Sequence, residues 1–356
     1  MEYSLMPIDT HRRAGLLHYE NCNSLFVYTC LFTPKYFCDT TDSAHVRRRT
    51  DPTQLQEKMM NAVVEFQQYD NTNFEQVRTR FDEEYGIAWS FMRPEPRPCF
   101  TKTTLHNLLE HHTYHENLKG HTVSNGGFQQ TNYLVLASDL PGVFNLGGDL
   151  AAFGDAIRAQ TRQELLSYAR LCIDNVWTLY NMQAPITTIS LVQGQAMGGG
   201  FEGALSTHIM IAEKSARMGL PEVLFNLFPG MGALSFLSRK IGMRAAEAMV
   251  RSGKVYTGEE LYEMGVVDVL AEDGQGEKAL YDWVRKNHRS LNSFQAIQRA
   301  KQRVNPLTIE ELYEITEIWV DAALRLSERD LKIMERLVRA QNRKAADPVM
   351  EQAMTA

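Results

Sequence analysis

Residues 193–202 read Gln-Gly-Gln-Ala-Met-Gly-Gly-Gly-Phe-Glu, and Leu220-Pro-Glu222 follows further along the chain. The glycine run from Gly198 to Gly200 comes after an apolar, strand-like segment, Ile186 to Val192, and before a run of small residues at helical spacing. Glycine lets a backbone approach a ligand closely, and the first turn of a helix presents unpaired N–H groups and a partial positive charge. The stretch therefore predicts a strand–turn–helix unit that can stabilise negative charge on an oxygen, with glutamates nearby to move protons.

The composition of the whole chain is that of an ordinary globular protein. The chain has 356 residues, of which 44% are apolar and 22% charged, and its net charge is −6. Basic runs such as Arg47-Arg48-Arg49 are short and isolated, which argues against nucleic acid as a partner. No window approaches the roughly 18 apolar residues of a membrane helix, and the N-terminus lacks the pattern of a secretory signal. We therefore expect a cytoplasmic protein that does not bind membranes.

Cysteine and histidine usage gives little support for a metal site. The chain has five cysteines and no CxxC pair, which favours free thiols in a reducing compartment. His106, His111, His112 and His115 cluster on an expected helix, but no carboxylate completes a ligand set. We interpret this cluster as the solvated face of the helix and expect neither a metal nor a cofactor.

The pattern of apolar residues divides the chain near Asn73. Before this point periodicity is weak apart from one expected helix, 55–68, and a turn at 69–73. After it, short apolar strands alternate with helices, which predicts an α/β fold with right-handed crossovers. The expected strands are 76–82, 86–92, 133–137, 186–192, 208–212 and 266–270, and the main expected helices are 101–117, 160–180 and one or two within 307–341.

Two glycine turns occur in similar settings, Gly147-Gly148-Asp149 and Gly198-Gly199-Gly200. If each turn aims one backbone N–H at the same oxygen, the two donors form an oxyanion hole. The alternative is that both are plain tight turns in an α/β sheet, and spacing alone favours it. A nucleotide-binding loop is disfavoured, because the glycines do not fit GxGxxG and no Gly-Lys-Ser/Thr follows.

Two glutamates stand in apolar surroundings. Glu202 falls in the first turn of its expected helix, and Glu222 follows a proline in an otherwise apolar segment. Burial raises the pKa of a carboxyl group and suits it to acid–base work near neutral pH. Each residue could equally be a solvated surface glutamate. If both face one pocket, they suit proton removal and delivery at adjacent carbons.

Four motifs together resemble the crotonase (enoyl-CoA hydratase/isomerase) superfamily in order and spacing, from about residue 75 to 345. They are Phe144-Asn-Leu-Gly-Gly-Asp-Leu150, Val192 to Glu202, Met218-Gly-Leu-Pro-Glu222 and Leu227-Phe-Pro-Gly-Met-Gly232. Together with Ile315-Thr-Glu-Ile-Trp-Val-Asp321, the sequences of these motifs are most similar to those of the bacterial diffusible-signal-factor synthases.

This resemblance implies a spiral of ββα turns closed by C-terminal helices, usually in a trimer or a dimer of trimers. The expected division is an N-terminal extension of unknown role at 1–73, a spiral core at 74–270 and a helical, trimerising region at 271–356. The extension has no counterpart in a minimal crotonase.

The resemblance also implies a thioester substrate whose carbonyl oxygen lies between two backbone N–H groups. These donors fall at Gly147 or Gly148 and at or beside Gly199, and the acid–base glutamates fall on Glu202 and Glu222. Signal synthases dehydrate a 3-hydroxyacyl thioester to a cis-2-enoyl product and cleave the thioester to release the free acid. We therefore expect synthesis of a fatty acid quorum-sensing signal, with the order of action of the two glutamates left open.

The sequence says less about which residues bind the acyl chain and about which carrier holds the thioester. The candidates for an acyl-chain pocket, each with plain core packing as an equal alternative, are Leu224, Phe225, Phe228, Met231 and Trp319. Leu150-Ala-Ala-Phe153 is apolar where many CoA-dependent hydratases carry lysine or glutamate, which favours an acyl carrier protein over CoA as the thioester carrier. Two alternatives stay open: an ordinary enoyl-CoA hydratase or isomerase, and a crotonase-fold binding partner of a sensor kinase.

Overall fold

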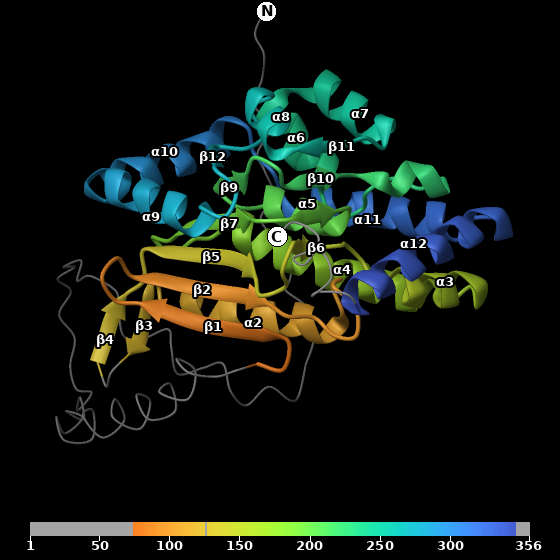
Figure 1. Ribbon diagram of the computed structural model, residues 1–356, viewed down its shortest axis with the longest axis horizontal. Coiled ribbons are helices and arrows are strands. Elements are labelled where there is room, and N and C mark those ends of the chain that lie inside the picture. The colour runs from red at the N-terminus through yellow and green to blue at the C-terminus, as the bar shows by residue number, and fades with distance from the viewer. Residues whose placement is uncertain (1–73, 125–126, 347–356) are drawn as a thin grey trace, which may run out of the picture. The chain divides into compact units, whose positions relative to one another are not determined.

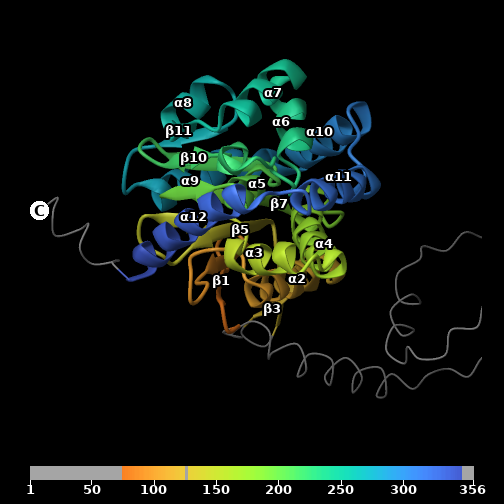
Figure 2. The same ribbon diagram turned by 90° about the vertical axis from the view of Figure 1, so that its right-hand side faces the viewer.

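The computed structural model describes residues 74–124 and 127–346, with side chains through Arg339. Within these residues the elements form two sheets wrapped by helices, together with a small hairpin, as Figures 1 and 2 show from two sides. The segment 1–73, including its expected helix and the boundary near Asn73, lies outside the described residues.

The larger sheet has six strands in the order β1-β2-β5-β7-β9-β12. β1 pairs antiparallel with β2, and all other neighbours pair parallel. Strands β2, β7 and β9 are buried along their whole length, which explains their continuous apolar runs. The strands are β1 (Val77–Asp82), β2 (Ile87–Met92), β5 (Tyr133–Ser138), β7 (Thr187–Val192), β9 (Ile209–Glu213) and β12 (Val269–Ala271).

The smaller sheet has four strands in the order β11-β10-β8-β6. The chain passes from β5 to β6, from β7 to β8 and from β9 to β10, each time leaving the large sheet for the small one before a helical segment follows. This repeat confirms the predicted α/β architecture of ββα turns. The strands are β6 (Val143–Asn145), β8 (Gln195–Met197), β10 (Arg217–Gly219) and β11 (Val255–Thr257), and β3 (His121–Ser124) and β4 (Gly127–Gln130) form a separate hairpin.

Helices cover both faces of the large sheet. Leu280 and Val284 of α9 pack on one face, and α2, α4 and α5 contribute to the main core on the other. The helices are α2 (Lys102–Asn117), α3 (Leu150–Arg158), α4 (Arg162–Tyr180), α5 (Gly199–Leu205), α6 (Ala233–Ile241), α7 (Met243–Ser252), α8 (Gly258–Glu263), α9 (Gly276–Asn287), α10 (Leu291–Val304), α11 (Ile309–Ala323) and α12 (Glu328–Ala346), with short 3₁₀ helices η1 (Pro221–Phe225) and η2 (His288–Ser290).

The expected C-terminal helices are present as α9 to α12 (Figure 1). α11 packs on α4, and α12 packs on α3 and η1. The division at residue 270 and a role of these helices in trimerisation stay predictions. No helix in the described ranges is long and apolar enough to span a lipid bilayer.

The interpretation of the histidine cluster as a solvated face is wrong for its last three members. His106 is exposed, but His111, His112 and His115 are buried because that side of α2 packs against β1 and β2. The hydroxyl of Ser90 on β2 lies 2.9 Å from His111 Nδ1 and 3.2 Å from His112 Nε2. A partner from a distant strand thus makes the burial of these polar rings tolerable.

Candidate active site

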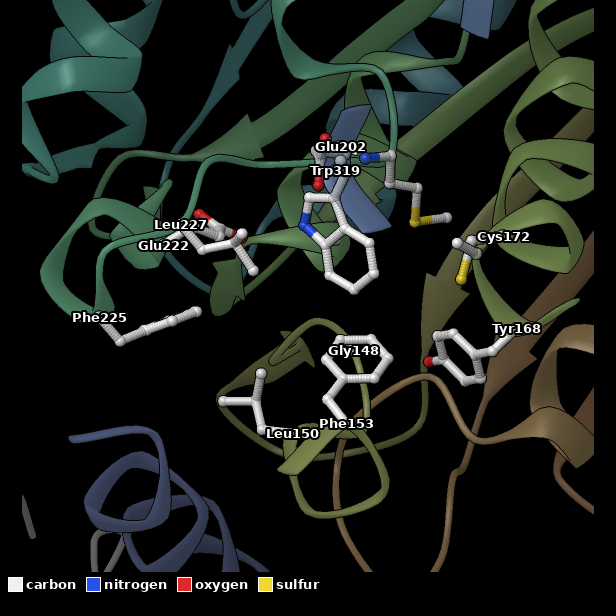
Figure 3. A pocket seen from close by; sticks show the side chains of 14 residues that line it. Gly148, Leu150, Phe153, Tyr168, Cys172, Glu202, Glu222, Phe225, Leu227 and Trp319 are labelled. Carbon is white, nitrogen blue, oxygen red and sulfur yellow. Dashed lines mark hydrogen bonds between the residues drawn. The ribbon is translucent and has the colours of Figure 1, made fainter. Parts of the chain in front are cut away.

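One cavity collects residues from both glycine turns and both glutamate motifs. Figure 3 shows Glu202 and Glu222 on one side of it and Leu150 and Phe153 across from them. The lining residues are Gly148, Leu150, Phe153, Tyr168, Ala169, Cys172, Gly199, Glu202, Glu222, Phe225, Leu227, Gly230, Met231 and Trp319.

Glu202 is buried, and its carboxyl group is held by the start of another helix. It lies in the first turn of α5 and keeps 2% of its surface exposed. Its Oε1 accepts hydrogen bonds from the backbone N–H of Met231 at 2.7 Å and of Ala233 at 2.9 Å, where α6 begins. Burial raises the pKa of Glu202, and the two amide donors partly offset that rise. The carboxyl group is therefore suited to both gain and lose a proton near neutral pH.

Glu222 comes from η1 and has a more strongly disfavoured charge. Its Oε2 has no exposed surface and no hydrogen-bond partner among the described residues. Burial raises the pKa of Glu222, and the nearby negative charge of Glu202 raises it further. Glu202 has two amide donors from another segment, whereas the backbone of Glu222 itself offsets the rise in its pKa only in part, so the pair favours one shared proton that rests on Glu222.

The two glycine turns lie side by side. Gly147 adopts a φ of +93°, and a Cβ there would lie 2.7 Å from the carbonyl oxygen of Met197, so the turn requires glycine. The N–H of Gly147 donates to Asn145 Oδ1 at 2.8 Å, whereas Gly148 lines the cavity. A Cβ built on Gly199 would lie 3.5 Å from the backbone nitrogen of Gly148. Of the first glycine pair, Gly148 is therefore the residue placed to act with Gly199.

Gly199 is the first residue of α5, so its N–H has no acceptor within the helix. Gly148 also lines the cavity, so backbone nitrogens from two neighbouring turns lie at the same wall. Such an arrangement is what stabilisation of a developing oxyanion requires.

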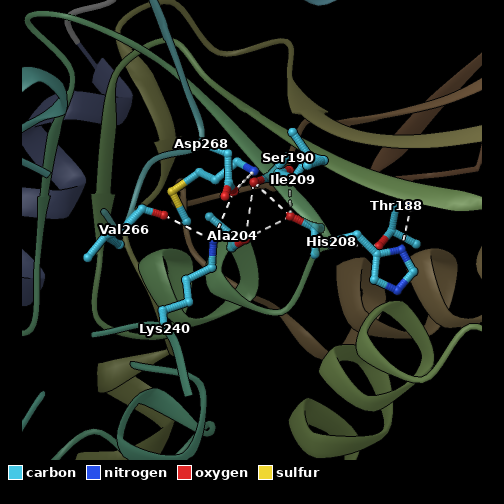
Figure 4. Close-up of polar contacts among 10 residues, drawn as sticks. Thr188, Ser190, Ala204, His208, Ile209, Lys240, Val266 and Asp268 are labelled. Carbon is cyan, nitrogen blue, oxygen red and sulfur yellow. Dashed lines mark hydrogen bonds and ion pairs between the residues drawn. The ribbon is translucent and has the colours of Figure 1, made fainter. Parts of the chain in front are cut away.

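Polar contacts fix the C-terminal ends of α5 and α6 (Figure 4). Ser190 Oγ and Thr207 Oγ1 donate to the carbonyl of Ala204 near the end of α5, at 3.1 and 3.0 Å. Lys240, near the end of α6, donates to Val266 O and pairs with Asp268 at 2.8 Å. The helix that carries Glu202 is thus anchored to β7 and to the segment before β9, and the helix that supplies its donors is anchored to the segment before β12.

The structure separates the five candidates for the acyl-chain pocket. Phe225, Met231 and Trp319 line the cavity, whereas Leu224 and Phe228 do not. Leu224 is 57% exposed, and Phe228 is half-buried against the main core. The three lining residues stay candidates for contact with an acyl chain.

Several lining residues were not expected from the sequence, and Tyr168 is the most informative. Its hydroxyl donates to the carbonyl of Phe100 and accepts from the N–H of Asp149 at 3.3 Å. Phe100 in turn donates its N–H to Gly147 O at 2.7 Å, so this tyrosine on α4 holds the turn that contains Gly148. Its place beside Ala169 and Cys172 on the apolar side of α4 is the only sequence signal that could have pointed to it.

The cavity has the composition of an organic ligand site. Its walls are largely apolar, with the two carboxyl groups and the glycine turns as the main polar features. Within residues 74–124 and 127–346, no three His, Cys, Asp or Glu side chains come together in a way that could hold a metal ion.

Comparison with protein families and curated proteins gives a consistent result. The family model described as enoyl-CoA hydratase/isomerase matches residues 90–330. Mitochondrial methylglutaconyl-CoA hydratase of Rattus norvegicus is 32% identical over 148 residues, which are 42% of this chain and 45% of that protein. The peroxisomal bifunctional enzyme of Danio rerio is 39% identical over 92 residues, 26% of this chain and 13% of that protein. The chain thus spans less than half the length of these relatives.

Solved structures show the same fold at low sequence identity. Pseudomonas aeruginosa DspI is 24% identical with a TM-score of 0.55, over 71% of this chain and 96% of that one. Human mitochondrial delta3-delta2-enoyl-CoA isomerase is 20% identical with a TM-score of 0.61, over 75% of this chain and 100% of that one. These likenesses agree with the fold predicted from the motifs.

Proposed function

Since the chain belongs to the enoyl-CoA hydratase/isomerase family, we propose that it is an enzyme that moves protons at the α- and β-carbons of an acyl thioester. The specific reaction we propose is dehydration of a 3-hydroxyacyl thioester of an acyl carrier protein to the cis-2-enoyl thioester. Hydrolysis of that thioester then releases an unsaturated fatty acid that serves as a quorum-sensing signal.

One observation carries the proposal. The carboxyl groups of Glu202 and Glu222 and the backbone of Gly148 and Gly199 all border one apolar cavity. The α-proton of a thioester becomes removable only if the enolate oxygen is stabilised, and two backbone donors supply that stabilisation. A carboxylate within reach can then take the proton.

The unequal environments of the two glutamates suggest their roles. With the proton on Glu222 and the charge on Glu202, the pair is ready to add water to an enoyl thioester. Glu202 takes a proton from the water that attacks the β-carbon, while Glu222 gives its proton to the α-carbon. Dehydration is the reverse and begins with the shared proton on Glu202: the charged Glu222 removes the α-proton, the β-carbon–oxygen bond breaks, and the leaving hydroxyl takes the proton of Glu202 to become water. In both directions, the two glutamates together carry one proton before the reaction and one proton after it.

Thioester hydrolysis uses the same groups. A water activated by a carboxylate of the pair attacks the thioester carbon, and the resulting oxyanion lies between the N–H groups of Gly148 and Gly199. The carbon–sulfur bond then breaks, and the thiol leaves with the proton that the pair had taken from water. This step supports release of a free acid without a further catalytic group.

The apolar wall supports a fatty acyl chain. Phe225, Met231 and Trp319 line the cavity next to the carboxyl groups, and the ring of Phe153 lies edge-on to Trp319 with 5.2 Å between centroids. From the resemblance of the sequence motifs to the crotonase superfamily, we also propose that the protein forms a homo-trimer or hexamer. Docking on a sensor kinase stays an expectation.

The similarity to methylglutaconyl-CoA hydratase favours a second candidate, an ordinary enoyl-CoA hydratase that exchanges hydrated and dehydrated thioesters. The test is to incubate the full chain with 3-hydroxydodecanoyl thioesters of carrier protein and of CoA and to identify the acids by mass spectrometry. Free cis-2-enoic acid is the expected product. Exchange of thioesters without free acid would establish the ordinary hydratase, and no turnover would contradict both.

A further inference from the structure

The outer side of α12 carries a stripe of positive charge. Arg329, Lys332, Arg336 and Arg339 are all exposed. At about 100° per residue, their spacing places all four within an arc of about 80° on the helix. None of them forms an ion pair within the described part of the chain. We call these four residues the α12 stripe.

The acidic residues of α12 form their ion pairs and hydrogen bonds with residues outside this stripe, and of its four members only Arg329 lowers the pKa of one of them, Asp330. Arg158 of α3 pairs with Glu335 at 2.5 Å and with Glu328 at 3.8 Å. Asp330 accepts from the N–H of Ser327, at the start of the helix, at 2.9 Å and from Asn226 beside η1 at 3.5 Å. The helix thus uses its carboxylates to attach itself to the protein and leaves its cations facing solvent. This segregation stands out in a chain whose net charge is −6.

The stripe borders the candidate active site. α12 packs on α3, which supplies Leu150 and Phe153 to the cavity, and on η1, which supplies Glu222 and Phe225 (Figure 2). The apolar side of α12, with Leu331 and Met334 buried, faces these elements. A partner held by the stripe therefore lies one helix diameter, about 10 Å, from the walls of the cavity.

We propose that the α12 stripe is the docking surface for an acidic carrier protein that presents the acyl thioester to the cavity. This inference rests on the proposed function, because it places the carrier of the same substrate. Opposite charges on two protein surfaces steer their encounter and fix their relative orientation. A carrier whose surface is acidic around its thioester arm meets a matching row of cations next to the place where the arm must enter.

Other anionic partners fit the stripe less well. A helix that binds a lipid surface inserts its apolar side, but the apolar side of α12 is already buried in the fold. Extended nucleic acid binding calls for basic residues over a wider face, whereas this row is a single narrow line on an acidic protein. A carrier protein matches both the charge and the position of the stripe.

The test compares two variants of the full chain that lose equal charge. The first combines Arg329→Gln, Lys332→Gln, Arg336→Gln and Arg339→Gln. The control combines Lys286→Gln, Arg289→Gln, Lys301→Gln and Arg303→Gln, four exposed cations around α9 and α10, at the opposite end of the molecule in Figure 1. Glutamine keeps the helix propensity. Both are assayed with the same acyl group on carrier protein, on CoA and on uncharged pantetheine.

We expect the first variant to lose at least about tenfold in kcat/KM with the acyl-carrier thioester at low ionic strength, and less at high salt. Turnover of the pantetheine and CoA thioesters should stay within about twofold, and the control should change none of the three. An unchanged rate with the carrier thioester would overturn the proposal. An equal loss with CoA would also overturn it, by assigning the stripe to the phosphate shared by CoA and the carrier arm.

A direct binding measurement separates this inference from the proposed function. Calorimetric titration with unacylated carrier protein should show salt-dependent binding to the wild type and to the control, and at least about tenfold weaker binding to the stripe variant. The affinity for unacylated carrier protein can be measured even if the wild type turns over no thioester. Such a lack of turnover would contradict the proposed function but not the docking surface. A change in particle mass of the stripe variant by light scattering would instead assign the stripe to an interface between copies of the chain and overturn the inference.

Discussion

The carboxyl group of Glu222 occupies the space into which a side chain on Gly198 would grow. A Cβ on Gly198 would lie 2.3 Å from Glu222 Oε1. Gly198 also adopts a φ of +51°, which L side chains rarely take, and it immediately precedes α5. The glycine turn therefore serves both the start of the Glu202 helix and the approach of the second carboxyl group.

Substituting Gly198 by alanine should displace Glu222 and strain the turn. We expect a loss of at least about a hundredfold in kcat with a folded product, because misplaced acid–base groups lose most of their contribution. Gly154→Ala on α3 is the matched control, since a Cβ there meets only Arg158 at 3.7 Å. The control should keep its activity and gain up to about 1 kcal/mol in free energy of unfolding. Equal activity of the two variants would show that Gly198 does not position Glu222.

The two carboxyl groups should make the protein less stable as the pH rises. Their folded-state pKa values are raised, so the contribution of the pair is fully present at low pH and is lost as pH rises through those values. The loss extends from the unfolded-state pKa up to the raised value of about 8 for Glu222, so between pH 6.5 and 8 the unfolding free energy of the wild type should fall. Glu222→Gln should fall less, by up to about 1.4 kcal/mol per pH unit. Urea denaturation at both pH values measures this, and parallel slopes for wild type and variant would contradict a raised pKa.

Two adjacent side chains of η1 provide a test of the acyl-chain pocket. Phe225 lines the cavity, whereas its neighbour Leu224 is exposed. Phe225→Ala should raise KM for a long-chain thioester about tenfold or more, since it removes a large apolar contact. Leu224→Ala should leave KM within about twofold. A similar rise for both variants would place the acyl chain elsewhere.

Buried histidines should make the protein sensitive to acid. Burial lowers the pKa of His111 to about 4 and holds those of His112 and His115 well below the usual range. Since the unfolded chain takes up protons first, stability should fall as pH drops below about 6.5. His115→Gln should reduce this slope by about 1.4 kcal/mol per pH unit. Exposed His106→Gln should leave it unchanged, and the same slope in both variants would contradict the account.

Residues within continuous motifs could be found from the sequence. Glu202, Glu222 and the two glycine turns stand at fixed spacings in their motifs, and the structure brings them to one cavity. Their catalytic roles stay predictions. The sequence could not choose between Gly147 and Gly148, because the choice depends on a hydrogen bond from Gly147 to Asn145 that only the folded turn displays.

The sequence could not predict the direction of a side chain where that direction depends on the exact helix type or on a distant partner. Positions three apart share a face in a 3₁₀ helix, so η1 turns Glu222 and Phe225 inward together and Leu224 outward. Nothing in the apolar sequence of this segment predicts a 3₁₀ helix. In the same way, burial of His111 and His112 depends on Ser90, which a separate strand supplies.

The most direct test of the central claim is exchange of the α-proton of a bound thioester with deuterium from solvent. We would follow it by NMR for a 3-hydroxyacyl thioester with wild type and with Glu222→Gln. The account predicts exchange with the wild type and a loss of at least about a hundredfold in the variant, with unchanged circular dichroism. Wild-type exchange in the folded Glu222→Gln protein would contradict the assignment of Glu222 as the group that removes the α-proton.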